Sequence, residues 1–307
     1  MSGIHIEGTV LEEIYLEIER RPLFEKYDRQ WEEPILHILK LKEELARFSW
    51  GSFYVQIHKL GSASYTLPSI EIAADLELIG FASRMLDNLV DEDNPRIEQR
   101  IGRANTLLLF TEILIESFGR LQRLLPDAGE AIQQYLMSAL HGEWMDINRT
   151  ALDGMAEREY MQQILPKTSS IFKLIALCGD PGGMKFWDEF LDYAGLAFQL
   201  SNDMAGLYAE TKSDLRMLRP TLPILKAVDV DDERIKAQRS RIIRAYATGE
   251  ETLEAARSAI EESGALEYCY LIRELHKEKC REMLSEQFSD RLAQTEELSR
   301  LLYLEAL

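Results

Sequence analysis

Apolar residues recur at steps of three and four along most of the chain, which is the spacing of one face of an α-helix. The longest such stretches are residues 35–48, 70–90, 104–125, 129–147, 186–208 and 266–284. Strict alternation, the strand pattern, is confined to residues 52–57. Glycine and proline clusters separate the stretches. We therefore predict an all-α fold of about ten helices, in one domain spanning residues 1–307.

The charge balance narrows the classes of partner. The chain has 53 acidic and 35 basic residues, a formal net charge of −18. This argues against nucleic acid and against anionic membranes as partners. No apolar run could span a bilayer. The three cysteines lack zinc spacing and no signal peptide is evident, which indicates a cytoplasmic protein.

Carboxylates and an amide cluster at the ends of two apolar stretches. Asp87 and Asp91 are four residues apart, so a helix would aim both side chains the same way. Asn202 and Glu210, at i and i+8, would do so on a second helix, with Asp203 beside them. Mg²⁺ prefers a few carboxylates together with water and substrate phosphate. We predict that these five residues bind Mg²⁺ and that the protein grips a diphosphate.

The sequence also predicts the position or the partner of several residues near these clusters. Arg84 precedes Asp87 by one turn and could either pair with it or bind phosphate. Glu71, Asp75 and Glu77 are expected on a solvated edge of the same helix. Pro166 predicts a helix break just before Lys167, which would turn backbone groups toward the site.

The chain also carries an ordered series of motifs: DNLVD at 87–91, GEWMDI at 142–147, Lys167-Thr168, FQLSND at 198–203, and Asp214 and Arg219 before Thr221-Leu222-Pro223. This series resembles the trans-isoprenyl diphosphate synthases and related class I terpenoid synthases. They have DDxxD, GQxxDL, KT, FQxxDD and TLP in the same order.

The resemblance implies a helical bundle around a central cavity, an allylic isoprenyl diphosphate substrate, a cluster of two or three Mg²⁺ ions, and a homodimer. Asp87, Asp91, Asn202 and Glu210 would be the catalytic metal ligands. The remaining candidates would contact the substrate: Lys167, Arg219, Lys212 and Gln199 on the diphosphate side, Trp144 as an indole face for a carbocation, and Phe81, Ala82 and Ser83 along the isoprenyl tail. The small residues 82 and 83 suggest room for a C15 or longer tail, although tight helix packing explains them equally well.

The departures from the family pattern also matter. Chain-elongating members bind a second diphosphate through a GKRxRP segment and an RRG triplet, and neither is found at 51–59 or 94–100. The third aspartate of the second motif is Gly206. We therefore favour a terpene synthase that cyclises or deprotonates the cation. A prenyltransferase acting on a peptide or another acceptor comes next, because DNLVDEDN at 87–94 is similar to a segment of ComQ-type enzymes. Chain elongation is third, and an inactive regulatory subunit is fourth.

Overall fold

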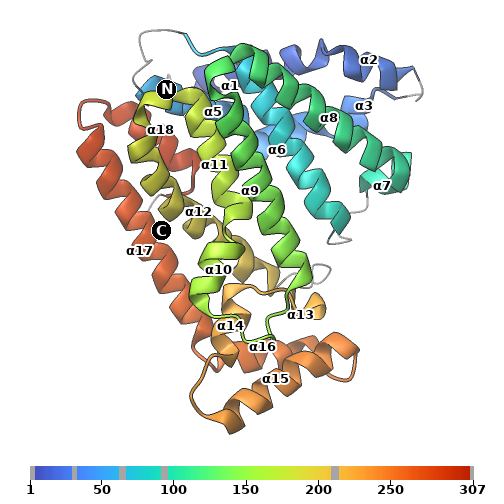
Figure 1. Ribbon diagram of the computed structural model, residues 1–307, viewed down its shortest axis with the longest axis vertical. Coiled ribbons are helices and arrows are strands. Elements are labelled where there is room, and N and C mark those ends of the chain that lie inside the picture. Colours follow the sequence, from blue (N-terminus) through green and yellow to red (C-terminus); the bar gives the residue numbers. More distant parts are fainter. Residues whose placement is uncertain (1–3, 30–32, 62–66, 91–95, 209–213, 305–307) are drawn as a thin grey trace. The chain divides into compact units, whose positions relative to one another are not determined.

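The structure is a computed structural model and describes residues 4–29, 33–61, 67–90, 96–208 and 214–304. Over these residues the chain forms eighteen α-helices and two short 3-10 helices, and no strand (Figure 1). The all-α prediction is confirmed, but about ten helices was too few, because the stretch 35–48 forms two helices and many short helices lie outside the expected stretches. None of the described helices is both long and apolar enough to cross a membrane. The chain divides into two compact units, so the single-domain organisation stays a prediction.

Unit 1 comprises residues 1–134, 174–187 and 290–301. Its helices are α1 (Ile4–Glu19), α2 (Pro22–Asp28), α3 (Ile35–Ile38), α4 (Leu41–Arg47), α5 (Trp50–Leu60), α6 (Ile70–Val90), α7 (Arg96–Ile101), α8 (Arg103–Leu124) and α18 (Leu292–Leu301). Helix α6 packs against α1, α5 and α8, and Figure 1 shows α6 and α8 side by side. It is surrounded because residues 72–82 are apolar on nearly every face and are buried without interruption.

The strand candidate at 52–57 was wrong, because these residues lie inside α5. Ser49 caps the helix by accepting a hydrogen bond from the amide of Ser52 at 3.0 Å. Phe53, Ile57 and Leu60 then bury one face at the helical spacing. A short apolar run reads the same in a buried strand and in a buried helix, so periodicity alone could not separate them.

Two acidic residues of α6 also differ from expectation. Glu71 is exposed as predicted, but Asp75 and Glu77 are fully buried. Asp75 lies 3.2 Å from both Arg21 and Arg120. Glu77 accepts hydrogen bonds from the Ser49 hydroxyl and the Gly51 amide. A buried carboxylate is stable only when such donors offset the loss of hydration. The local sequence around Asp75 and Glu77 does not reveal these donors.

Unit 2 comprises residues 135–173, 188–289 and 302–307. Its helices are α10 (Glu157–Gln163), α13 (Asp214–Met217), α14 (Leu222–Val228), α15 (Glu233–Thr248), α16 (Leu253–Glu261) and α17 (Ala265–Gln287). The short, buried α14 contacts α10, α15, α16 and α17. The unit boundaries fall within α9 (Gly129–Asn148), α11 (Pro166–Gly179) and α12 (Met184–Gly206), and the 3-10 helices cover Pro126–Ala128 and Pro181–Gly183.

Candidate active site

The two predicted metal motifs lie at the ends of α6 and α12. Asp87 is half-buried in the last turn of α6, and Asn202 is exposed in the last turn of α12. Asp91, Glu210 and Lys212 lie outside the described residues. Helix α12 ends at Gly206, so the i and i+8 spacing of Asn202 and Glu210 on one continuous helix was wrong.

Asp203, next to Asn202, is buried and fully engaged. Its Oδ2 accepts hydrogen bonds from the Tyr160 hydroxyl at 2.8 Å and from the Leu222 amide at 3.0 Å. Its Oδ1 accepts one from Gln199 Nε2 at 2.8 Å. Burial raises the pKa of the Asp203 carboxyl, and these hydrogen bonds oppose the rise. With both oxygens occupied, Asp203 is placed to hold α10, α12 and α14 together.

Lys167 begins the neighbouring network. Its Nζ lies 2.5 Å from Asp146 Oδ2 and 3.9 Å from Glu143 Oε2, both on α9. The predicted break is present, since α10 ends at Gln163 and α11 begins at Pro166. The amide of Lys167, however, bonds to the Ile164 carbonyl, and those of the next two residues bond to Leu165. The break therefore presents the Lys167 side chain rather than free amides.

Gln199 and Arg219 join the same unit 2 network. The Thr168 hydroxyl donates to Gln199 Oε1 at 2.7 Å, which fixes the amide that bonds Asp203. Arg219 is buried, and its Nη1 donates to the Asp146 carbonyl at 3.2 Å. The Arg219 amide in turn bonds the Asp214 carbonyl at 2.8 Å. Lys167, Gln199, Asp203 and Arg219, which come from separate motifs of the series, thus lie in one hydrogen-bonded region of unit 2.

Four participants were not among the predicted site residues. Asp146 and Glu143 could have been found, because both belong to the GEWMDI segment. Thr168 is the second residue of the Lys167-Thr168 pair, and a hydroxyl beside a candidate lysine is a usable signal. Tyr160 belongs to no recognised motif, and its role depends on the fold alone.

The unit 1 candidates are divided between a charged cluster and the core. Arg84 lies beside Glu44 at 3.6 Å and Glu77 at 3.8 Å, an arrangement that the sequence did not suggest. Phe81 and Ala82 are buried. Ser83 is half-buried and its hydroxyl bonds the Ile79 carbonyl at 3.0 Å. In unit 2, Trp144 is 57% exposed and stacks on His141.

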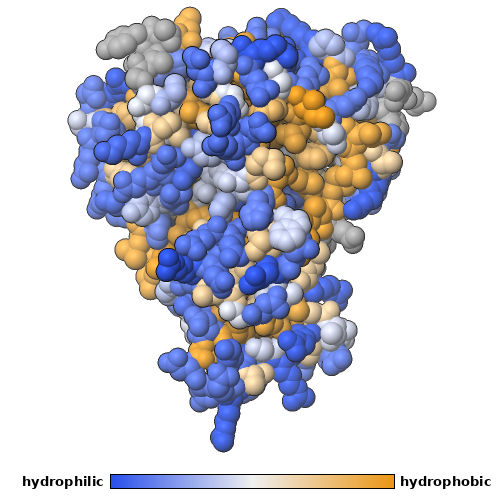
Figure 2. Space-filling view, in the orientation of Figure 1, coloured by the Kyte–Doolittle hydropathy of each residue, from blue (hydrophilic) through white to orange (hydrophobic). Residues whose placement is uncertain are grey.

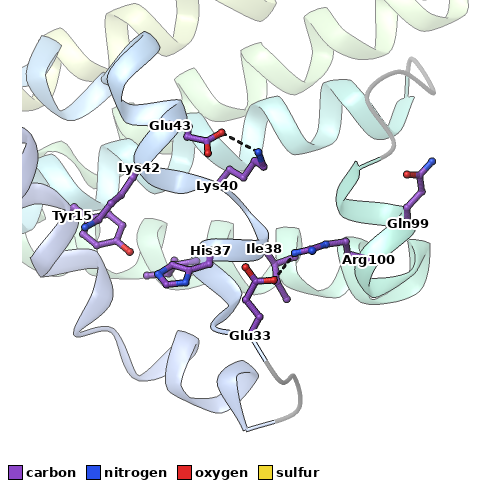
Figure 3. A pocket seen from close by; sticks show the side chains of 10 residues that line it. Tyr15, Glu33, His37, Ile38, Lys40, Lys42, Glu43, Gln99 and Arg100 are labelled. Atoms are coloured by element: carbon purple, nitrogen blue, oxygen red, sulfur yellow. Dashed lines mark hydrogen bonds and ion pairs between the residues drawn. The ribbon is translucent and has the colours of Figure 1, made fainter.

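A separate cavity of about 590 Å³ in unit 1 contains none of the predicted site residues. Figure 3 shows Arg100 paired with Glu33 and Lys40 paired with Glu43 at its wall. Lys42 lies over the Tyr15 ring, 4.3 Å from its centre. The cations of this wall are matched by carboxylates or a ring, so it does not resemble a diphosphate site.

The side chains at the ends of α6 and α12 can be judged as possible metal ligands. Among the described residues, no three His, Cys, Asp or Glu side chains gather into a ready-made metal cage. Asp87 and Asn202 nevertheless offer hard oxygen atoms, the type that Mg²⁺ selects. Mg²⁺ also keeps several waters and takes substrate phosphate as ligand, so it needs few protein ligands. Taken singly, each of these two residues is therefore better suited to a Mg²⁺ ion delivered with a diphosphate than to a permanently bound ion.

Comparison with known proteins identifies the family of the chain. The polyprenyl synthetase family model matches residues 53–263, more than half of the chain. The chain belongs to the polyprenyl synthetase family. Tryptophan prenyltransferase ComQ of Bacillus subtilis subsp. natto is 26% identical over 296 residues, covering 89% of each chain. Octaprenyl diphosphate synthase of Escherichia coli is 26% identical over 223 residues, covering 65% of this chain and 67% of its own.

Solved structures of the family share the fold. A polyprenyl synthase from Caulobacter crescentus, solved with calcium and isoprenyl diphosphate, aligns with a TM-score of 0.74 at 18% identity. The alignment covers 99% of this chain and 97% of that one. A decaprenyl diphosphate synthase from Rhodobacter capsulatus aligns with a TM-score of 0.71 at 20% identity, covering 97% and 98%. The polyprenyl synthetase fold of this chain thus extends beyond the matched family segment.

Proposed function

We propose that this polyprenyl synthetase family member is a Mg²⁺-dependent prenyltransferase that moves an isoprenyl group from an allylic diphosphate to an acceptor other than a second diphosphate. The observation that supports this proposal is that helix α5 is buried and contains no arginine. Its segment 51–59 stands where chain-elongating relatives place diphosphate-binding arginines. Here nearly all of it is buried and it contains no arginine. A second diphosphate needs several cations, and α5 offers a packed apolar helix instead.

The comparison with ComQ supports the same choice. Its similarity extends over 89% of both chains, whereas the octaprenyl synthase match covers 65% of this chain. The ComQ relative is named as a tryptophan prenyltransferase. We therefore propose an aromatic, indole-bearing acceptor, such as a tryptophan within a peptide.

The site residues have separate roles in this proposal. Lys167 and Arg219 hold the diphosphate of the substrate through charge-assisted hydrogen bonds. Mg²⁺, bound through Asp87 and Asn202, together with Asp91 and Glu210, would neutralise the diphosphate as it leaves. Asp146 keeps the Lys167 ammonium in place until the anion arrives. Asp203, whose two oxygens already accept three hydrogen bonds within unit 2, is assigned the role of positioning the end of α12 instead of binding Mg²⁺.

The favoured terpene synthase of the sequence analysis becomes the second candidate. The relatives described above are prenyltransferases rather than cyclases. A cyclase would need only the allylic substrate, whereas a transferase needs an acceptor as well. Dependence on an acceptor therefore separates the two reactions.

The test is to incubate the protein with Mg²⁺ and farnesyl or geranylgeranyl diphosphate, with and without isopentenyl diphosphate or tryptophan-containing peptides. We expect diphosphate release and a prenylated peptide only when peptide is present, and loss of both in Asp87→Ala. Asp127→Ala, which removes an exposed carboxylate of unit 1, is the matched control. A hydrocarbon formed without acceptor would overturn the proposal in favour of cyclisation. Lengthened diphosphates would overturn it in favour of elongation.

The homodimer implied by family resemblance is also a proposal, and α8 supports it. Leu107, Leu108 and Ile115 of α8 are exposed by 43%, 60% and 66%. Figure 2 shows apolar side chains gathered over this helix. A contiguous apolar helix face of this kind suits a protein partner. Analytical ultracentrifugation should find a dimer for the wild type and a monomer for Leu108→Glu/Ile115→Glu, whereas a monomeric wild type would refute the proposal.

A further inference from the structure

Helix α15 (Glu233–Thr248) carries a charge opposite to that of the chain as a whole. Its sixteen residues include five basic side chains and a single acidic one. The whole chain has a formal net charge of −18. None of the α15 side chains belongs to the candidate active site, so the proposed reaction does not account for this positive helix.

Three of the basic side chains share one exposed face of α15. Arg234, Arg241 and Arg244 are all exposed, and their spacing of seven and then three residues directs them to the same side of the helix. The exposed positions between them are Ala237 and Gln238, so no carboxylate interrupts this arginine face. At the rise of an α-helix, the face is about 15 Å long.

The guanidinium groups of the arginine face have no ion-pair partner among the residues that the structure describes. The other two cations of α15 differ, because Lys236 lies 3.9 Å from Glu233 and Arg239 donates to a main-chain carbonyl at 3.1 Å. Arg234 also lies in the first turn of α15, where the helix dipole disfavours a cation. An anionic partner would relieve both conditions.

The arginine face belongs to a part of unit 2 that contacts the candidate site. Helix α15 packs against α13 and α16 (Figure 1). On the α13 side, the Arg216 guanidinium lies over the Tyr246 ring, 5.7 Å from its centre. On the α16 side, Arg257 Nε donates to the Leu207 carbonyl at 2.7 Å, and Leu207 directly follows the end of α12. A molecule bound to the arginine face is thus held by helices that are tied to the end of α12.

The size of the arginine face favours a short acidic segment over an extended anionic surface. A membrane or a nucleic acid would also meet the rest of this acidic chain, which repels it. A short segment interacts mainly with charges within one Debye length, which is about 8 Å at physiological ionic strength. Clusters of arginine side chains are a recurrent means of recognising acidic peptide motifs.

We propose that the arginine face of α15 docks an acidic segment of the peptide acceptor and so holds the acceptor close to the candidate active site. This inference rests on the proposed function, because it names the class of acceptor peptide. The arginines pair with carboxylates of the acceptor through charge-assisted hydrogen bonds. They take no part in the chemistry, so docking lowers the KM for the peptide and leaves kcat unchanged.

The experiment compares two fluorophore-labelled peptides that differ only in charge. The first carries several glutamates beside a single tryptophan, and the second carries glutamine at the same positions. Fluorescence anisotropy measures binding, and peptide prenylation with farnesyl diphosphate and Mg²⁺ gives kcat and KM. The test variant is Arg241→Glu/Arg244→Glu. Arg158→Glu/Lys279→Glu is the matched control, because it makes the same change of charge at accessible cations on other helices of unit 2.

We expect the wild type to bind the glutamate peptide roughly tenfold more tightly than the glutamine peptide at low ionic strength. Added salt should weaken this binding. Arg241→Glu/Arg244→Glu should abolish the difference and raise the KM for the glutamate peptide, with kcat and Mg²⁺-dependent diphosphate binding unchanged. The control variant should keep most of the difference.

Equal binding of the two peptides to the wild type would overturn the inference, and so would an equal loss in the control variant. Tighter binding of the wild type to phosphatidylserine vesicles than to the glutamate peptide, lost in the test variant, would assign the face to a membrane instead. Self-association of the wild type that the test variant lacks would assign it to a second copy of the chain. Prenylation of both peptides with the same KM would overturn the inference while the proposed function stands. Glutamate-dependent binding without any prenylated peptide would support an acidic-peptide surface and refute the proposed function.

Discussion

Asp203 on α12 accepts a hydrogen bond from the backbone amide of Leu222, the first residue of α14, at 3.0 Å. The side chain of the preceding residue, Thr221, makes no capping hydrogen bond to this helix. A carboxylate from another helix therefore caps α14, where its charge also suits the positive end of the helix dipole. In this way the second motif is tied to the Thr221-Leu222-Pro223 segment through a structural contact.

Asp203→Asn should lower the free energy of unfolding by about 2–3 kcal/mol, because an amide cannot accept all three hydrogen bonds and leaves a buried donor unsatisfied. Urea unfolding would measure the loss. Tyr160→Phe removes one of the three donors and should cost only about 1 kcal/mol. Equal stability of Asp203→Asn and the wild type would contradict the capping role.

Lys167→Ala should weaken binding of a non-hydrolysable allylic diphosphate analogue by roughly 10- to 100-fold, since one charge-assisted hydrogen bond is lost. Isothermal titration calorimetry with Mg²⁺ present is the measurement. Lys173→Ala is the matched control, because Lys173 lies on the same helix and is paired with Asp192 at 2.7 Å. Similar weakening in both variants would indicate a general loss of charge instead of a specific contact.

Ser83→Phe should shift the preferred substrate to a shorter isoprenyl tail if residue 83 borders the tail. Competition between geranyl, farnesyl and geranylgeranyl diphosphate would report the shift in kcat/KM. Ser83→Ala removes only the hydroxyl bonded to Ile79 and should leave the preference unchanged. An unchanged preference in Ser83→Phe, with normal folding, would place the end of the tail elsewhere.

Asp75 predicts a pH dependence of stability. Burial raises the pKa of its carboxyl from 3.8 to about 6, although Arg21 and Arg120 oppose the rise. Between these two values the folded protein holds a proton that the unfolded chain releases, so this contribution is complete below about pH 4 and is lost as pH rises through 6. The destabilisation caused by Asp75→Asn should therefore shrink by about 3 kcal/mol between pH 4 and pH 7. A constant difference in urea unfolding across this range would refute the shift.

The backbone at Leu218 is expected to be strained, and replacing Leu218 by glycine should relieve the strain. Its φ of 54° is a left-handed conformation that costs a side-chain-bearing residue about 1–2 kcal/mol. Leu218 also packs against the unit 2 core, so both truncations lose that contact. Leu218→Gly should nevertheless be more stable than Leu218→Ala by about 1 kcal/mol in thermal unfolding. The reverse order would show that the turn is not strained.

The sequence predicted the all-α class and singled out four residues that lie in the unit 2 network, Lys167, Gln199, Asp203 and Arg219, because helical periodicity and ordered motifs are local signals. It could not predict that Asp203 turns inward while the adjacent Asn202 stays exposed, since that depends on where α10 and α14 pack. Asp75 and Glu77 were assigned to solvent because their partners, Arg21, Arg120 and Ser49, are distant in sequence. The i and i+8 argument for Glu210 failed because α12 ends at Gly206.

Lys167 occupies the first turn of α11, where the aligned peptide dipoles leave partial positive charge. An ammonium group at this end of a helix opposes the dipole, and Asp146 and Glu143 of α9 lie beside it. A diphosphate bound there would add negative charge next to both the ammonium group and the helix N-terminus. Binding of a diphosphate should thus stabilise the folded state of unit 2. The protein with bound diphosphate should unfold at a higher temperature than the protein alone.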